Sequence, residues 1–256
     1  MKQRWITAIG LLLILVPSLL AGGIFFRIIA SIFAIGGCYE LLQLFSEKWP
    51  KWSIVSIYII FILGLISAFN FKYFVLLDCV VLLFLFLILI WHQEVDFESI
   101  GLIYLIFNIV TLTIASIEMM YSINKMLLFY TLFATYITDS FALFTGKAFG
   151  KNKLNPRISP NKTIEGTLGG YISGAVCSFL FGYFFIKEVP IVFLIAGSLI
   201  MPIIGQMGDL AFSAIKRHFN IKDFGSIFPG HGGILDRVDS MTFNSLVMFC
   251  LMSTLL

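Results

Sequence analysis

The chain has 256 residues, of which 59% are hydrophobic and only 12% charged, and its formal net charge is +3. A soluble domain of this length carries about twice that fraction of charged residues, so the composition excludes an ordinary soluble enzyme. It predicts an all-α, polytopic integral membrane protein. The four cysteines lie scattered in apolar runs without metal-ligand or redox spacing, which indicates packing roles and no zinc site.

Long apolar runs follow one another along the whole chain. A helix needs about 20 mostly apolar residues to cross a bilayer, and the chain offers about nine such runs. The first is preceded by Met-Lys-Gln-Arg and is interpreted as an uncleaved span, and the fifth is short. We expect transmembrane helices at roughly 5–21, 24–46, 53–71, 73–91, 100–117, 127–146, 165–186, 190–212 and 240–256.

The basic residues predict which face of the membrane each loop occupies. With nine spans and a cytoplasmic N-terminus, only Arg27, Lys72, Lys125 and Lys187 fall outside, and all other lysines and arginines fall inside. The loops 147–163 and 213–239 then both open on the cytoplasmic face and can build one site. We therefore divide the chain into N-terminal transmembrane helices, 1–120, and a C-terminal catalytic region, 121–256.

Small residues recur at every fourth position in the run 165–186. Such a stripe lets another helix approach closely. The partner helix belongs either to the same chain or to a second copy in a homodimer. The stripe consists of Gly166, Gly170, Gly174, Ser178 and Gly182.

The loop 147–163 and the span before it combine one buried acid with many cations. Asp139 lies inside an apolar span, where a carboxylate is costly, and it is either functional or the partner of a basic residue on a neighbouring helix. The segment 159–163, Ser-Pro-Asn-Lys-Thr, precedes a helix start and could hold phosphate on free backbone amides. A lipid head-group anchor is the alternative role of the basic residues Lys147, Lys151, Lys153, Arg157 and Lys162.

The second loop alternates carboxylates with lysine and arginine around a glycine-rich turn. Carboxylates can share a hard Mg²⁺ ion with substrate phosphates, and the cations offset the remaining negative charge, so the pattern predicts a polyphosphate site. No Walker-type or kinase motif accompanies it. The candidate residues are Asp209 near the end of the preceding span and, in the loop, Ser213, Lys216, Arg217, Lys222, Asp223, His231, Gly232, Gly233, Asp236, Arg237 and Asp239.

These segments resemble the phosphatidate cytidylyltransferase (CDP-diacylglycerol synthase) family. The resemblance covers about 138–240. Its C-terminal motif elements are Ser213-x-x-Lys216-Arg217, Lys222-Asp223, Pro229-x-His231-Gly232-Gly233 and Asp236-Arg237-x-Asp239. Its upstream elements are Asp139-Ser140, Gly146-Lys147, Gly150-Lys151, Ile158-Ser159-Pro160, Lys162-Thr163 and Glu165-Gly166. The chain departs from the family pattern at Leu143 and Ile164, which replace a usual tyrosine and a usual aromatic residue.

The resemblance implies a reaction in which CTP and phosphatidate give CDP-diacylglycerol and pyrophosphate. It implies Mg²⁺ on Asp209 and Asp236 and a homodimer; the sequence leaves open whether a monovalent cation is also bound. Catalytic roles would fall on Asp209, Lys216, Arg217, Asp236 and Arg237. Substrate contacts or their support would come from Ser159, Lys162, Ser213, Lys222, Asp223, His231, Gly232, Gly233, Asp239 and Asp139.

Three other functions remain open at this point. The same chemistry could act on another lipid phosphate, such as an ether lipid. A transporter with a polar intracellular gate also has many spans and an intramembrane aspartate, but the polar residues cluster in two loops and no internal repeat is present. The paired carboxylates disfavour a lipid-binding scaffold. We expect a bacterial inner-membrane location and no nucleic-acid partner.

Overall fold

Long apolar helices make up most of the computed structural model, which describes residues 10, 13, 16–45, 49–69, 73–228 and 232–256. Within these described ranges, eight helices are long and apolar enough to cross a membrane. The predicted polytopic helical fold is thus confirmed, whereas the expected span 5–21 lies mostly outside the described residues. The helices are α2 (Gly23–Gln43), α3 (Lys51–Ala68), α4 (Phe74–Trp91), α5 (Phe97–Ile123), α6 (Met126–Phe149), α7 (Ile164–Phe185), α8 (Ile191–His218) and α9 (Leu235–Leu255).

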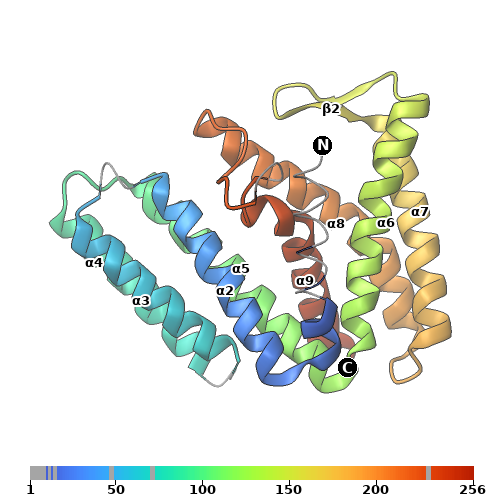
Figure 1. Cartoon of the computed structure of the whole chain (residues 1–256), viewed down its shortest axis with the longest axis horizontal. Coiled ribbons are helices and arrows are strands. Elements are labelled where there is room, and N and C mark those ends of the chain that lie inside the picture. The colour runs from blue at the N-terminus through green and yellow to red at the C-terminus, as the bar shows by residue number, and fades with distance from the viewer. Residues whose placement is uncertain (1–9, 11–12, 14–15, 46–48, 70–72, 229–231) are drawn as a thin grey trace. The chain divides into compact units, whose positions relative to one another are not determined.

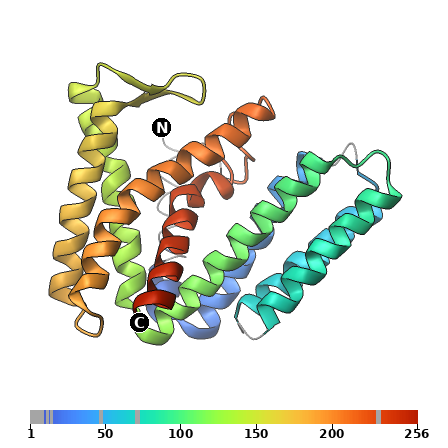
Figure 2. The same ribbon diagram turned by 180° about the vertical axis from the view of Figure 1, so that it is seen from behind.

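The helices form two compact units. The first contains Met1–Ala115 with Asp223–Arg237, and the second contains Ser116–Lys222 with Val238–Leu256. In the first unit α2 packs on α3, which packs on α4; in the second, α6 and α7 pack together and both contact α8 (Figure 2). The predicted division of function at residue 120 stays a prediction.

The small-residue stripe of α7 packs against α6 of the same chain (Figure 1). A Cβ atom added at Gly170 would lie 2.7 Å from the carbonyl oxygen of Thr138, and one at Gly166 would lie 2.7 Å from that of Ala142. Further along α7, Gly182 contacts Leu194 of α8. Of the two predicted roles for the stripe, packing within one subunit is therefore the one the structure contains.

Helix α8 extends beyond the predicted span 190–212 and takes up the first part of the predicted loop 213–239. No glycine or proline lies between positions 213 and 218, and Lys216, Arg217 and His218 stabilise the C-terminal end of the helix dipole. The helix ends in a Schellman motif: Asn220 has φ 54°, its N–H bonds to the Arg217 carbonyl, and Ile221 N–H bonds to the Lys216 carbonyl.

The predicted loop 147–163 contains a two-stranded hairpin that the sequence did not reveal. Strand β1 (Lys153–Asn155) pairs antiparallel with β2 (Ser159–Thr163), with Lys153 opposite Thr163. The Glu165 side chain accepts hydrogen bonds from the backbone N–H of Lys151 and Asn152, and so fixes the base of the hairpin to the start of α7. Proline at positions 156 and 160 obscured the strand pattern.

Two further boundaries differ from the prediction. Helix α5 has 27 residues instead of the short run 100–117, and it begins where the Asp96 carboxylate accepts the N–H of Ser99 as an N-terminal cap. Helix α9 begins at Leu235 instead of residue 240. The residues Asp236, Arg237 and Asp239 are therefore helical.

We expect Gly170→Ala to destabilise the protein, because the new methyl group meets a backbone carbonyl that cannot rotate away. Overpacking of this kind costs about 1–3 kcal/mol, and it should lower the Tm of the purified protein in detergent. Gly101→Ala in α5 is the matched control, since nothing lies within 4 Å of a Cβ at that position. Equal Tm values for the two variants would contradict the packing described.

Candidate active site

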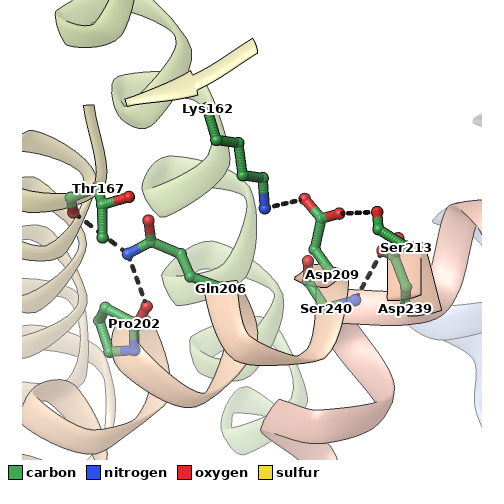
Figure 3. A network of polar contacts seen from close by, with 8 residues as sticks. All are labelled: Lys162, Thr167, Pro202, Gln206, Asp209, Ser213, Asp239 and Ser240. Atoms are coloured by element: carbon green, nitrogen blue, oxygen red, sulfur yellow. Dashed lines mark hydrogen bonds and ion pairs between the residues drawn. The ribbon is translucent and has the colours of Figure 1, made fainter. Parts of the chain in front are cut away.

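An ion pair between the hairpin and α8 lies at the centre of the polar residues in the second unit. The Nζ atom of Lys162 in β2 lies 2.5 Å from Oδ2 of Asp209 in α8, and both side chains are partly exposed, at 26% and 30%. The Ser213 hydroxyl, one helical turn after Asp209, donates to Oδ1 over 3.3 Å (Figure 3). A lysine and a serine from the two predicted loops thus meet an aspartate from the end of the predicted span 190–212.

Two more carboxylates lie close enough to Asp209 for their charges to interact. Asp139 of α6 and Asp239 of α9 both interact electrostatically with Asp209. Two lysines offset part of this negative charge, because Lys162 interacts electrostatically with Asp139 and Lys216 with Asp239. Asp139 therefore has a basic neighbour, although this lysine lies in strand β2 and not on a neighbouring helix, as one of its two predicted roles required.

Ser240 is a member of this cluster that sequence reasoning missed. Its side chain forms a hydrogen bond with Asp139, and its N–H donates to Oδ1 of Asp239 over 2.7 Å. The residue is buried. No sequence signal distinguishes it, because a serine next to an aspartate is common in helix starts.

A hydrogen-bonded glutamine fixes α8 one turn before Asp209. The Gln206 side-chain amide donates to the carbonyl of Pro202 in its own helix over 3.0 Å and to the carbonyl of Thr167 in α7 over 3.3 Å (Figure 3). These bonds join α7 to α8 and hold the helix segment that carries Asp209.

Arg217 ties the hairpin to the end of α8. Its Nε–H donates to the carbonyl of Ile158 over 3.3 Å, and Nη1 donates to the carbonyl of Ile221 over 2.9 Å. The side chain thus already has a structural role besides the catalytic one that the resemblance implies. It also keeps the neighbouring strand residue Ser159 near the C-terminal end of the helix.

Residues 223–228 and 232–237 of the first unit, called the glycine-rich segment below, are organised around Asp236. Oδ2 of this buried carboxylate accepts the N–H groups of Phe224 over 2.8 Å and of Gly233 over 3.0 Å. Gly232 has φ 81°, and a Cβ there would lie 3.0 Å from Asp236 Oδ2 and 3.2 Å from Asp223 Oδ1. Only glycine suits this backbone, so both aspartates can approach it.

Glu40 of α2 belongs to the same segment and was also missed. It accepts the N–H groups of Ile234 over 2.8 Å and of Leu235 over 3.1 Å, and it is 1% exposed. The rule that singled out Asp139, a carboxylate inside an apolar span, applies equally to Glu40 and could have found it.

The remaining predicted residues have fewer contacts. Ser159 lies in β2 opposite Asn155. Lys222 and Arg237 are exposed, and His231 lies outside the described residues.

The whole chain, not only the segments around the site, matches a known family. The family profile described as "Cytidylyltransferase family" aligns with residues 2–255. The chain belongs to the cytidylyltransferase family. The resemblance seen in its loops is thereby confirmed, and it extends to the N-terminal half, where the sequence offered only hydrophobicity.

Curated relatives of this cytidylyltransferase cover nearly its full length. It is 33% identical over 257 residues to the phosphatidate cytidylyltransferase of Bacillus subtilis (strain 168), which covers 95% of this chain and 94% of the relative. It is 34% identical over 274 residues to the phosphatidate cytidylyltransferase of Staphylococcus aureus (strain COL), with 95% of each chain covered. The similarity to that of Staphylococcus haemolyticus (strain JCSC1435) is 33% over 258 residues, again with 95% of each covered.

The carboxylates of the cytidylyltransferase fit Mg²⁺ in type but do not form a protein cage. Among the described residues, no group of three or more histidines, cysteines or acidic residues has the geometry to hold a metal alone. Mg²⁺ is usually held by one or two carboxylates and takes its other ligands from water and substrate phosphates. Asp209 in the second unit and Asp236 in the first each provide hard oxygen donors of this kind, so each carboxylate suits the ion in donor type.

Removing the Lys162 charge should loosen the hairpin. In Lys162→Met the ion pair with Asp209 is lost, and a partly exposed pair contributes up to about 1 kcal/mol. We expect amide hydrogen exchange in 159–163 to be about fivefold faster. Lys153→Met is the matched control, because Lys153 is exposed in the same hairpin; equal exchange in both variants would refute a role for the ion pair in holding the hairpin.

Proposed function

We propose that this membrane cytidylyltransferase transfers the cytidylyl group of CTP to phosphatidate, forming CDP-diacylglycerol and releasing pyrophosphate. The observation that carries the proposal is the similarity to phosphatidate cytidylyltransferases over 95% of the chain. The apolar helices also suit a substrate that stays in the bilayer while its phosphate reaches a polar site at the helix ends.

The proposed reaction needs no nucleophile from the protein. A phosphate oxygen of phosphatidate attacks the α-phosphorus of CTP, the bond from that phosphorus to the bridging oxygen breaks, and pyrophosphate leaves with the electron pair. The attacking oxygen is already anionic near neutral pH. The principal barrier is the approach of two polyanions, so positioning and charge stabilisation should supply most of the catalysis.

The basic side chains are the groups we assign to charge stabilisation. Lys162, Lys216 and Arg217 lie around the end of α8, where they can exchange protein contacts for phosphate oxygens. We assign Arg237, Lys222 and His231 to phosphate contacts only because they match the C-terminal motif elements of the family. Hydroxyl and backbone N–H donors to phosphate would come from Ser159, Ser213, Gly232 and Gly233.

The acidic residues divide into two proposed roles. We assign Asp209 and Asp236 to Mg²⁺, which when bound neutralises phosphate charge and orients the reacting groups. Asp139, Asp223 and Asp239 would hold the basic side chains and the glycine turn in place. The interaction of Asp239 with Lys216 and the position of Asp223 beside Gly232 support this division.

Location and assembly follow from the same resemblance. We propose that the protein lies in a bacterial inner membrane as a homodimer, with its N-terminus and both polar loops in the cytoplasm. The distribution of basic residues supports this orientation. Cleavage of the segment 147–163 by protease added outside intact cells would contradict the orientation, and a single-chain mass for the native protein in mild detergent would contradict the dimer.

The purified protein should release pyrophosphate when CTP, Mg²⁺ and phosphatidate are all present. Product formation is followed with radiolabelled CTP and lipid extraction, and omission of the lipid is the control. Phosphatidate is to be compared with an ether-linked lipid phosphate. If no lipid phosphate gives a lipid product, the proposal is wrong. If only the ether lipid gives a product, the ether-linked lipid phosphate is the substrate instead of phosphatidate.

Asp209→Asn should lower kcat by at least about 100-fold, because it removes a charge proposed to face the metal and phosphates. Since the asparagine is isosteric, we expect normal membrane insertion, and since the lost ion pair with Lys162 contributes at most about 1 kcal/mol, we expect only a small change in Tm. Asp96→Asn is the matched control, because asparagine caps a helix as well as aspartate does. Near-normal activity of Asp209→Asn at all Mg²⁺ concentrations would refute the metal assignment.

A further inference from the structure

Helix α2 holds the start of α9 through a buried carboxylate. We propose that Glu40 is a positioning residue for cytidylyl transfer: it fixes the first amides of α9, and thereby the place and orientation of Asp236. The inference rests on the function proposed above and adds to it a residue from the N-terminal half of the chain.

The hydrogen bonds at the start of α9 show how specific this contact is. Three consecutive backbone N–H groups end on carboxylates: that of Gly233 on Asp236 and those of Ile234 and Leu235 on Glu40. Each Glu40 oxygen accepts one of these hydrogen bonds: Oε1 accepts the N–H of Ile234, and Oε2 accepts the N–H of Leu235. Glu40 and Asp236 also interact electrostatically.

The sequence around residue 234 explains why a distant residue is needed. The first amides of a helix have no partner inside the helix, and a serine, threonine, aspartate or asparagine just before it usually accepts one of them. Here Ile234 occupies that position, and its side chain cannot accept a hydrogen bond. A buried carboxylate at the positive end of the helix dipole replaces the local cap.

One face of α2 is shaped to receive this segment. Glycines at positions 36 and 37 lie against the side chains of Ile234 and Leu235, so that any larger residue there would collide with them or press on them. Phe33 packs its ring 6.0 Å from that of Phe228. Positions 33, 36, 37 and 40 have the spacing of a single helix face.

The glycine-rich segment in turn makes room for the carboxylate. A Cβ at Gly225 would lie 2.5 Å from Oε1 of Glu40, and one at Gly233 would overlap both carboxylate oxygens. Neither glycine has a positive φ. Their role is thus close approach to Glu40 and not an unusual backbone conformation.

The experiment compares the full-length wild-type protein with Glu40→Gln. Glutamine keeps the size of the side chain, but its amide group donates where the second carboxylate oxygen accepted, so one α9 amide faces another donor. Glu94→Gln is the matched control, because it makes the same chemical change at an exposed position of the first unit.

Two measurements separate positioning from general stability. In Glu40→Gln we expect amide exchange in 232–237 to be at least about tenfold faster, measured without nucleotide or lipid. We also expect the Mg²⁺ concentration for half-maximal activity to rise about tenfold, as for other residues that orient a metal ligand. A purely structural role would lower the amount of active protein without moving that Mg²⁺ concentration.

Gly225→Ala tests the same contact without changing any charge. The new methyl group should displace the Glu40 carboxylate and reproduce both shifts, whereas Gly101→Ala should reproduce neither. Wild-type exchange and Mg²⁺ dependence in both Glu40→Gln and Gly225→Ala would overturn the inference. If the wild-type protein itself forms no lipid product, the proposed function fails instead, while the exchange measurement still decides whether Glu40 holds α9.

Discussion

The free backbone groups at helix ends are the constraint on which the polar parts of this protein depend. Within a membrane protein these groups have little water to bond with and need partners from the chain. Thr163 caps α7 through the N–H of Gly166, Asn220 closes α8 in a Schellman motif, and Glu40 caps α9. Each of these ends carries residues of the family signature, so the same bonds that satisfy the backbone also build the candidate site.

Charge pairing is the second principle of the candidate site. In the second unit Lys162 and Lys216 offset part of the negative charge of Asp139, Asp209 and Asp239. Acids and bases of this kind attract and orient one another near the polar ends of the helices. A phosphate oxygen can take the place of the carboxylate beside a lysine, and a divalent cation can take the place of the lysine beside a carboxylate. Neither exchange leaves the remaining protein charge uncompensated.

Composition and hydrophobic runs predicted most of the fold, because crossing a bilayer demands length and apolarity and little else. They failed at helix ends: the polar residues Ser213 to Arg217 suggested a loop, although nothing there breaks a helix. Motif spacing found the residues of the family motif but not Glu40. Its two hydrogen-bond partners, Ile234 and Leu235, are 194 and 195 residues further along the chain. A pairing over that separation depends on tertiary packing, which no local pattern encodes.

That long separation also has a consequence for how the protein is made. Helix α2 is synthesised long before α9, at whose start the amides bound by Glu40 lie. In the interval its carboxylate must find other solvation, from water, lipid head groups or the insertion machinery. The glycine-rich segment can reach its final geometry only after α9 has emerged, so this part of the candidate site is completed well after α2 has been inserted.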